Sequence, residues 1–165
     1  MIKDDTRQTI KFVAWVIAII IAVYIAAVII VFMAGSPSRK NDRQINQVAS
    51  QKTPIKNVQQ YYHLNRGTDS YALKGTAKKG QVYYFIYLPN SKKAYLLPSR
   101  KGVGENEIRS KFNQQHGQQK ISNVNLGWYK GQAVWEVTSQ NSQGNYSYTL
   151  YKFKNGSKIS EVANL

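Results

Sequence analysis

Residues 61–97 read YYHLNRGTDSYALKGTAKKGQVYYFIYLPNSKKAYLL, and residues 126–162 of the same chain can be laid beside them. Both stretches contain short runs rich in Tyr, Val and Ile, separated by turn residues. A tyrosine-rich run lies at the same place in each, at 82–87 and at 146–151. In the second stretch, large residues alternate with smaller or polar ones, as half-buried strands require. This self-similarity predicts two copies of one structural unit.

Turn residues divide each copy into an antiparallel meander of four strands. We expect strands at residues 55–64, 70–76, 82–88 and 94–97 in the first copy, and at 121–129, 133–139, 146–153 and 158–162 in the second.

A short helix is expected before each meander. Residues 39–51 carry Ile45, Val48 and Ala49 at spacings of three and four, and residues 105–115 carry Ile108 and Phe112 one turn apart. The predicted fold class is therefore α+β, with helix-plus-antiparallel-sheet units at 39–98 and 99–165. Each unit has only about 60 residues, so we expect the copies to pack together and bury apolar surface between them.

Ahead of the repeat, residues 12–33 read FVAWVIAIIIAVYIAAVIIVFM, without a charged, Asn, Gln, Pro or Gly residue. At about 1.5 Å per helical residue this run spans roughly 33 Å, which matches the hydrocarbon core of a bilayer. Every face is apolar, whereas a core helix of a soluble protein would show a polar stripe. We interpret it as an uncleaved transmembrane helix, because it is longer than the apolar region of a signal peptide.

The expected topology follows from this helix. Residues 1–11 form a cytoplasmic head, 12–33 cross the membrane and 34–38 form a linker whose Pro37 can open the next helix. Basic residues flank the helix almost equally, so the positive-inside rule does not fix its orientation. We expect a cytoplasmic N-terminus and an extracytoplasmic C-terminal region, because long following domains are translocated largely regardless of charge.

Charge is the second strong feature of the composition. The chain carries a formal net charge of +15, and the region after the apolar run holds 20 basic against six acidic residues. Such a surface should attract lipid headgroups, anionic wall polymers or nucleic acid, with nucleic acid the least favoured. Cysteine is absent, which excludes thiol nucleophiles, disulfides and cysteine metal sites. A disulfide-free extracytoplasmic domain fits a Gram-positive surface better than an animal secretory route.

The sequence predicts no catalytic residue, cofactor site or metal site. His63 and His116 are the only histidines, and they lie far apart with no motif around them. Glu105 and Glu107 are two apart on an expected helix and so point in different directions, which favours a role at the helix N-terminus. No phosphate loop, zinc spacing or nucleophile elbow is present. We therefore expect a protein that is not an enzyme.

The candidate interaction residues are basic or aromatic and lie in predicted turns or joints. They are Lys78, Lys79, Lys92, Lys93, Arg100, Lys101, Trp128, Tyr129 and Lys130. The basic residues are candidates for a patch facing anionic lipid or teichoic acid, with solvated loop charge as the alternative. For the aromatic pair the alternatives are an exposed contact and core packing. Trp135 lies between Val134 and Val137, and we expect it in the core.

The order of these features resembles the TseB (YpmB-like) family of cell wall elongation regulators of Gram-positive bacteria. An N-terminal anchor precedes two helix-plus-meander units, with a tyrosine-rich hairpin in the first and Trp135-Glu136-Val137 followed by Tyr146-Ser-Tyr in the second. The likeness extends over roughly residues 10–165. It implies a tandem cystatin-like or PepSY-like fold outside the membrane, and control of peptidoglycan synthesis by contact with a class B penicillin-binding protein or another wall-synthesis protein. It implies no catalytic residues.

Three functions stay open from the residues. The first is a membrane-tethered regulator that acts on wall synthesis and cell elongation by protein contact. The second is a basic surface receptor for an anionic polymer such as teichoic acid, lipid headgroups or DNA. The third is a PepSY-like inhibitor of an extracytoplasmic peptidase, which rests on fold analogy alone.

Overall fold

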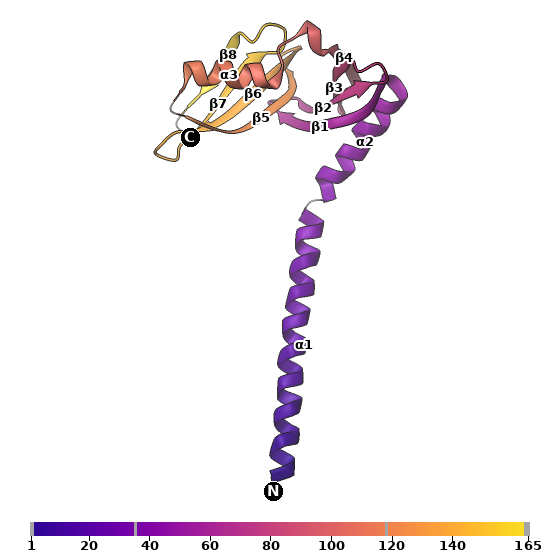
Figure 1. Cartoon of the computed structure of the whole chain (residues 1–165), viewed down its shortest axis with the longest axis vertical. Coiled ribbons are helices and arrows are strands. Elements are labelled where there is room, and N and C mark those ends of the chain that lie inside the picture. The colour runs from indigo at the N-terminus through magenta and orange to yellow at the C-terminus, as the bar shows by residue number, and fades with distance from the viewer. Residues whose placement is uncertain (1, 35, 118, 164–165) are drawn as a thin grey trace. The chain divides into compact units, whose positions relative to one another are not determined.

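The computed structural model describes the backbone of residues 2–34, 36–117 and 119–163, and the side chains of 12–30, 42–117 and 119–163 (Figure 1). The chain divides into two compact units, Met1–Asn41 and Asp42–Leu165. In the first unit, helix α1 spans Ile2–Ala34. Its segment Phe12–Ile30 is long and apolar enough to cross a membrane, and none of it is buried against protein. An apolar helix with no protein partner fits a lipid environment.

The linker that we expected between the apolar helix and the next helix is shorter in the structure. Helix α1 extends to Ala34 and α2 spans Ser36–Lys52, so most of the expected linker 34–38 is helical. Pro37 lies in the first turn of α2. Its missing N–H costs nothing there, because the first amides of a helix have no partner within the helix.

The first meander follows α2 with β1 (Ile55–Asn65), β2 (Asp69–Ala77), β3 (Val82–Leu88) and β4 (Lys93–Pro98). A 3₁₀ turn, η1 (Ser99–Lys101), leads to α3 (Glu105–Gln115). The second meander comprises β5 (Lys120–Tyr129), β6 (Gln132–Gln140), β7 (Tyr146–Lys152) and β8 (Lys158–Val162). The sheets have the orders β1-β2-β3-β4 and β5-β6-β7-β8, all antiparallel. The α+β prediction and its two four-stranded units are confirmed.

Helix α2 packs on one face of the first sheet, because its narrow apolar stripe meets the alternate residues of β2 and β3. Ile45 and Ala49 are buried there together with Leu73 and Phe85. Ile55 at the start of β1 completes this small cluster.

The opposite face of the first sheet joins a larger core that the two copies share. It contributes Ala72, Tyr84 and Ile86, while α3 contributes Ile108 and Phe112. Further members come from the second sheet: Val124, Leu126, Trp135, Val137 and Tyr151. Helix α3 therefore covers one face of the second sheet, and the expectation that the copies bury apolar surface between them is confirmed (Figure 1).

Trp135 lies at the centre of this shared core, as its strand position predicts. Its ring meets the rings of Tyr62 and Tyr84 edge to face, each at 5.5 Å between centroids. Its indole Nε1 donates a hydrogen bond to the carbonyl oxygen of Val103 at 2.8 Å. A buried indole N–H needs such a partner, so the segment between η1 and α3 is fixed to the core through its backbone.

The β1–β2 hairpin crosses strand β5 at very short range. A Cβ atom on Gly127 would clash with Leu64 and lie 2.6 Å from the Ser70 hydroxyl oxygen, so only glycine fits at this crossing. The Ser70 hydroxyl accepts a hydrogen bond from the Trp128 backbone N–H at 3.0 Å and donates one to the Leu64 carbonyl at 2.8 Å. These contacts fix the first copy against the second.

Candidate functional site

One end of the first sheet collects exposed basic side chains. The pairings of Ile55 with Ala77, Thr76 with Val82 and Tyr83 with Pro98 place four strand ends together there. The β2–β3 turn, η1 and the end of α2 lie beside these strand ends. The exposed basic residues of these segments are Lys52, Lys56, Lys78, Lys79, Arg100 and Lys101. We call this group the basic end.

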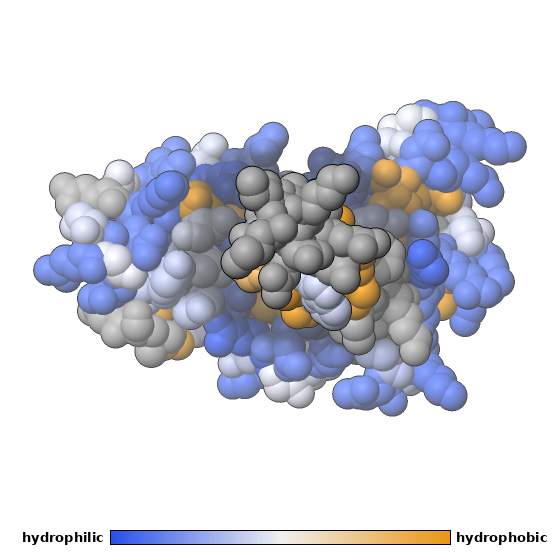
Figure 2. All heavy atoms as spheres, turned by 90° about the horizontal axis from the view of Figure 1, so that it is seen from below, coloured by the Kyte–Doolittle hydropathy of each residue, from blue (hydrophilic) through white to orange (hydrophobic). Residues whose placement is uncertain are grey.

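The segments that carry the basic end contain no carboxylate. Residues 52–56, 76–83 and 97–102 contain no Asp or Glu. Among the residues that the structure describes, none of the six basic side chains takes part in an ion pair. Their summed field is therefore open to an anion from solution. Hydrophilic residues likewise cover most of the coloured surface on the face drawn in Figure 2.

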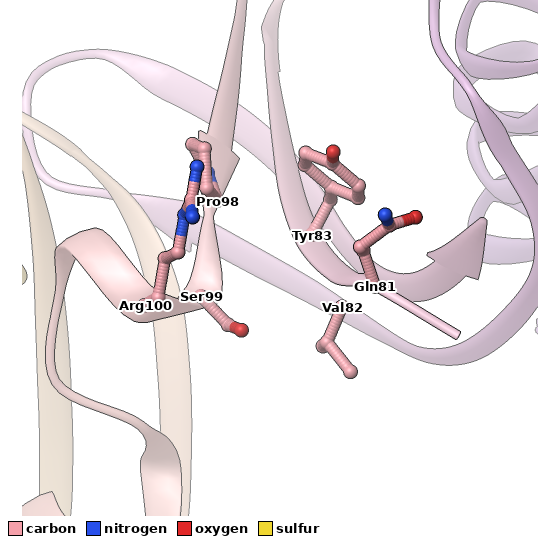
Figure 3. A pocket seen from close by; sticks show the side chains of 6 residues that line it. All are labelled: Gln81, Val82, Tyr83, Pro98, Ser99 and Arg100. Carbon is pink, nitrogen blue, oxygen red and sulfur yellow. The ribbon is translucent and has the colours of Figure 1, made fainter. Parts of the chain in front are cut away.

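A pocket of about 290 Å³ opens at the basic end. It lies between the start of β3 and the corner where β4 meets η1, and it is lined by Gln81, Val82, Tyr83, Pro98, Ser99 and Arg100. Tyr83 and Gln81 form one side, and Arg100 lies beside Pro98 on the other (Figure 3). A guanidinium, a hydroxyl and an amide thus line one small opening, and all three can donate hydrogen bonds to an anion.

The structure separates the basic residues that the sequence singles out. Lys78, Lys79, Arg100 and Lys101 lie at the basic end, whereas Lys92 in the β3–β4 turn and Lys93 at the start of β4 lie at the opposite end of the sheet. Lys52 and Lys56 are the members that the sequence interpretation missed. Their positions follow from the meander order alone, because the start of β1 must lie next to the β2–β3 turn.

The aromatic candidates have different environments. Trp128 stacks on Tyr95 of the first sheet, with ring centroids 3.9 Å apart, so it packs between the copies. Tyr129 is half-buried beside the cluster of Leu64 and Val134. Lys130 is exposed in the two-residue β5–β6 turn, and its Nζ lies 5.3 Å from the Tyr129 ring centroid. Of these three residues, Lys130 has the most accessible side chain.

A buried ion pair joins the copies and was missed from the sequence. Glu136 of β6 is 7 % exposed and pairs with Arg66 of the β1–β2 hairpin, which is 33 % exposed. The Arg66 guanidinium also lies 4.7 Å from the ring centroid of Tyr148. Glu136 lies between the core residues Trp135 and Val137 in β6. A charged residue in such a buried strand needs a partner, and this was the only local signal of the ion pair in the sequence.

The histidines do not come together in a site. His63 contacts Asp69 at 2.6 Å and stacks on Tyr71 of the first sheet. His116, directly after α3, stacks on Phe112 of that helix, with its Nε2 3.8 Å from a Glu161 oxygen. No group of three His, Cys, Asp or Glu side chains able to hold a metal occurs among the described residues.

Three buried tyrosines serve as hydrogen-bond donors or packing groups. Burial, followed by the charge of Glu105, raises the pKa of Tyr62, whose hydroxyl donates to the Glu105 carboxylate at 3.0 Å. Burial also raises the pKa of Tyr84. The pKa of Tyr151 rises to about 12, first through burial and then through Glu161. These hydroxyls stay protonated at neutral pH and are poor nucleophiles.

Comparison with known proteins confirms the resemblance that the residue pattern indicates. The chain is 27% identical over 116 residues to the "Probable cell wall elongation regulator TseB" of Bacillus subtilis, covering 69% of this chain and 71% of that protein. Its fold matches the solved structure of the YpmB protein from Bacillus subtilis with a TM-score of 0.62 and 25% identity, over 72% of this chain and 93% of that one. No protein-family model matches the chain.

Proposed function

We propose, on the premise that the chain is TseB/YpmB-like in sequence and fold, that it is a membrane-anchored regulator of cell wall synthesis and cell elongation. In this proposal residues 12–33 are the anchor, residues 1–11 lie in the cytoplasm and both sheets lie outside the membrane. The protein acts by contact with other proteins and catalyses no reaction.

The observation that carries the proposal is the similarity to a relative named as a cell wall elongation regulator, which extends over most of both chains. The fold agrees, because the YpmB structure is covered almost completely. The apolar segment Phe12–Ile30 adds the means of confinement to a membrane. A tether raises the effective concentration of the sheets near membrane-bound partners, so modest contacts suffice.

The proposed partner is a class B penicillin-binding protein, as the family resemblance implies, or another protein of wall synthesis. The β5–β6 turn offers a contact point, because Lys130 projects from a tight turn next to the half-buried Tyr129 ring. Tyrosine is among the residues enriched where protein interfaces hold most of their binding energy, and an exposed lysine beside it can steer the encounter with an acidic partner.

The ionisable groups support a role without catalysis. The carboxylates of Glu105, Glu136 and Glu161 each hold a basic or hydroxyl partner. The two histidines lie apart, His63 on β1 and His116 directly after α3. A hydrolase needs a nucleophile with an oriented base, and these contacts serve packing and the connection between copies.

Deletion of the gene tests the proposed function. We expect changed cell length or width and changed sensitivity to β-lactams that target wall synthesis, both restored by the full chain. The matched control is a chain with Gln114→Ala, a change at an exposed position of α3, which should restore both as well. A deletion strain with unaltered dimensions and β-lactam sensitivity would contradict a role in elongation.

A further inference from the structure

We propose that the basic end of the first sheet docks on the phosphate headgroups of an anionic lipid bilayer, and that the pocket between Tyr83 and Arg100 receives one headgroup. The inference rests on the membrane anchor of the proposed function. It adds a second, electrostatic contact between the protein and its membrane.

The charge distribution supports an anionic ligand at this end. Six exposed basic residues gather there with no acidic residue in the segments that carry them. None of these six side chains takes part in an ion pair among the described residues, whereas Arg66, Arg109 and Lys158 pair with carboxylates. Each basic residue near an anionic bilayer contributes about 1 kcal/mol of attraction, which is about five-fold in binding.

The pocket gives this attraction a specific phosphate site. Arg100 offers a planar guanidinium that can donate two parallel hydrogen bonds to phosphate oxygens. The Ser99 hydroxyl and the Gln81 amide line the same opening (Figure 3). Its volume, about 290 Å³, is at the lower end of small-ligand pockets. The exposed residues Lys78, Lys79 and Lys101 lie within three residues of Gln81 or Arg100 in the chain.

The length of the tether favours lipid over a soluble polymer. Only 11 residues separate Ile30, at the end of the apolar span, from Asp42, where the compact unit begins. Even fully extended, they reach no more than about 40 Å. The short tether therefore keeps the compact unit close to the membrane surface and gives its basic residues a high effective concentration near the headgroups.

The experiment uses the full chain reconstituted in lipid nanodiscs. Because the chain contains no cysteine, a single label can be attached at Asn57→Cys near the basic end, or at Ser91→Cys at the opposite end of the sheet. Energy transfer from the label to an acceptor on the lipid headgroups reports docking. It is compared in zwitterionic discs and in discs containing anionic phospholipid, at low and high salt.

We expect higher transfer from the Asn57→Cys label in anionic than in zwitterionic discs, and none of this gain from the Ser91→Cys label. High salt should abolish the gain. The variant K78Q/K79Q should lower the ratio of docked to undocked protein about 30-fold, by the same five-fold effect for each residue. The matched control K92Q/K93Q removes the same charge from the opposite turn and should leave the ratio unchanged. Arg100→Lys, which keeps the charge, should weaken docking because it loses the planar fork.

Equal transfer in both lipids, or equal loss from both lysine pairs, would overturn the proposal. Soluble poly(glycerol phosphate) that binds in zwitterionic discs, with no effect of anionic lipid, would assign the site to a polymer and also overturn it. A chain that fails to insert into discs would refute the anchor of the proposed function. A chain that inserts but ignores lipid charge would refute only the docking.

Discussion

Glu136 shows how one residue connects the two copies. It occupies a central strand, where a carboxylate without a partner would cost several kcal/mol. Arg66 reaches it from the hairpin of the other copy and also covers the Tyr148 ring. The buried carboxylate of Glu136 therefore has its partner only when the two sheets are correctly assembled.

Arg66→Gln should lower the free energy of unfolding by about 2 kcal/mol, below the range for fully buried pairs because Arg66 is one-third exposed. Urea denaturation of residues 36–165, followed by tryptophan fluorescence, measures this. Both tryptophans of that fragment, Trp128 and Trp135, lie where the copies meet. Arg109→Gln is the control, since it breaks a more exposed pair on α3 and should cost about 0.5 kcal/mol or less. Equal losses from both variants would contradict a special role for Arg66.

The raised pKa of Tyr151 predicts that the protein loses stability at high pH. Its pKa is about 12 in the folded chain and about 10 in the unfolded chain. The contribution of Tyr151 to the free energy of unfolding is therefore fully present below pH 10 and is lost as the pH rises toward 12. Tyr62 and Tyr84 act in the same direction. In Tyr151→Phe the fall over this window should be shallower, although the lost bond to Gln115 costs about 1 kcal/mol at neutral pH. Urea denaturation at several pH values measures the free energy of unfolding of both proteins. If its slope against pH between 10 and 12 is the same in both, the predicted role of Tyr151 is wrong.

At the scale of elements, most of the fold could be predicted from local patterns. Alternation of large and small residues marked the strands, and turn residues set their ends, because a half-buried strand imposes both locally. Contacts between elements carry no such signal. Nothing in the sequence near Ser70 or Gly127 indicates that the two segments cross at short range.

Helix α2 is held to the first sheet by a narrow stripe, so a single truncation there should have a large effect. Ile45 is 1 % exposed and packs with Leu73 and Phe85. Ile45→Ala should cost about 3 kcal/mol, through lost burial and the cavity that remains. Gln47→Ala, on the exposed side of α2, should change stability by less than about 0.5 kcal/mol. Chemical denaturation of both variants compares them. Similar small losses would show that α2 does not depend on this stripe.

At the scale of the whole molecule, the proposed function depends on the anchor as much as on the sheets. Residues 36–165, secreted without the apolar segment, should complement a deletion strain poorly, because the tether supplies most of the effective concentration at the membrane. The same residues behind an unrelated single transmembrane helix should complement well. Cell length and width provide the measurement. Full rescue by the secreted form would reduce residues 12–33 to a delivery signal.

The central claim is regulation of wall synthesis by direct protein contact at the membrane. The most direct measurement places a photo-crosslinking amino acid at Lys130 in the full chain, irradiates living cells and identifies the captured protein. The same residue at Asn90, in the turn at the opposite end of the first sheet from the basic end, is the comparison. We predict capture of a class B penicillin-binding protein or another wall-synthesis protein at Lys130. If neither position captures a protein of wall synthesis while the chain supports normal elongation, the account is contradicted.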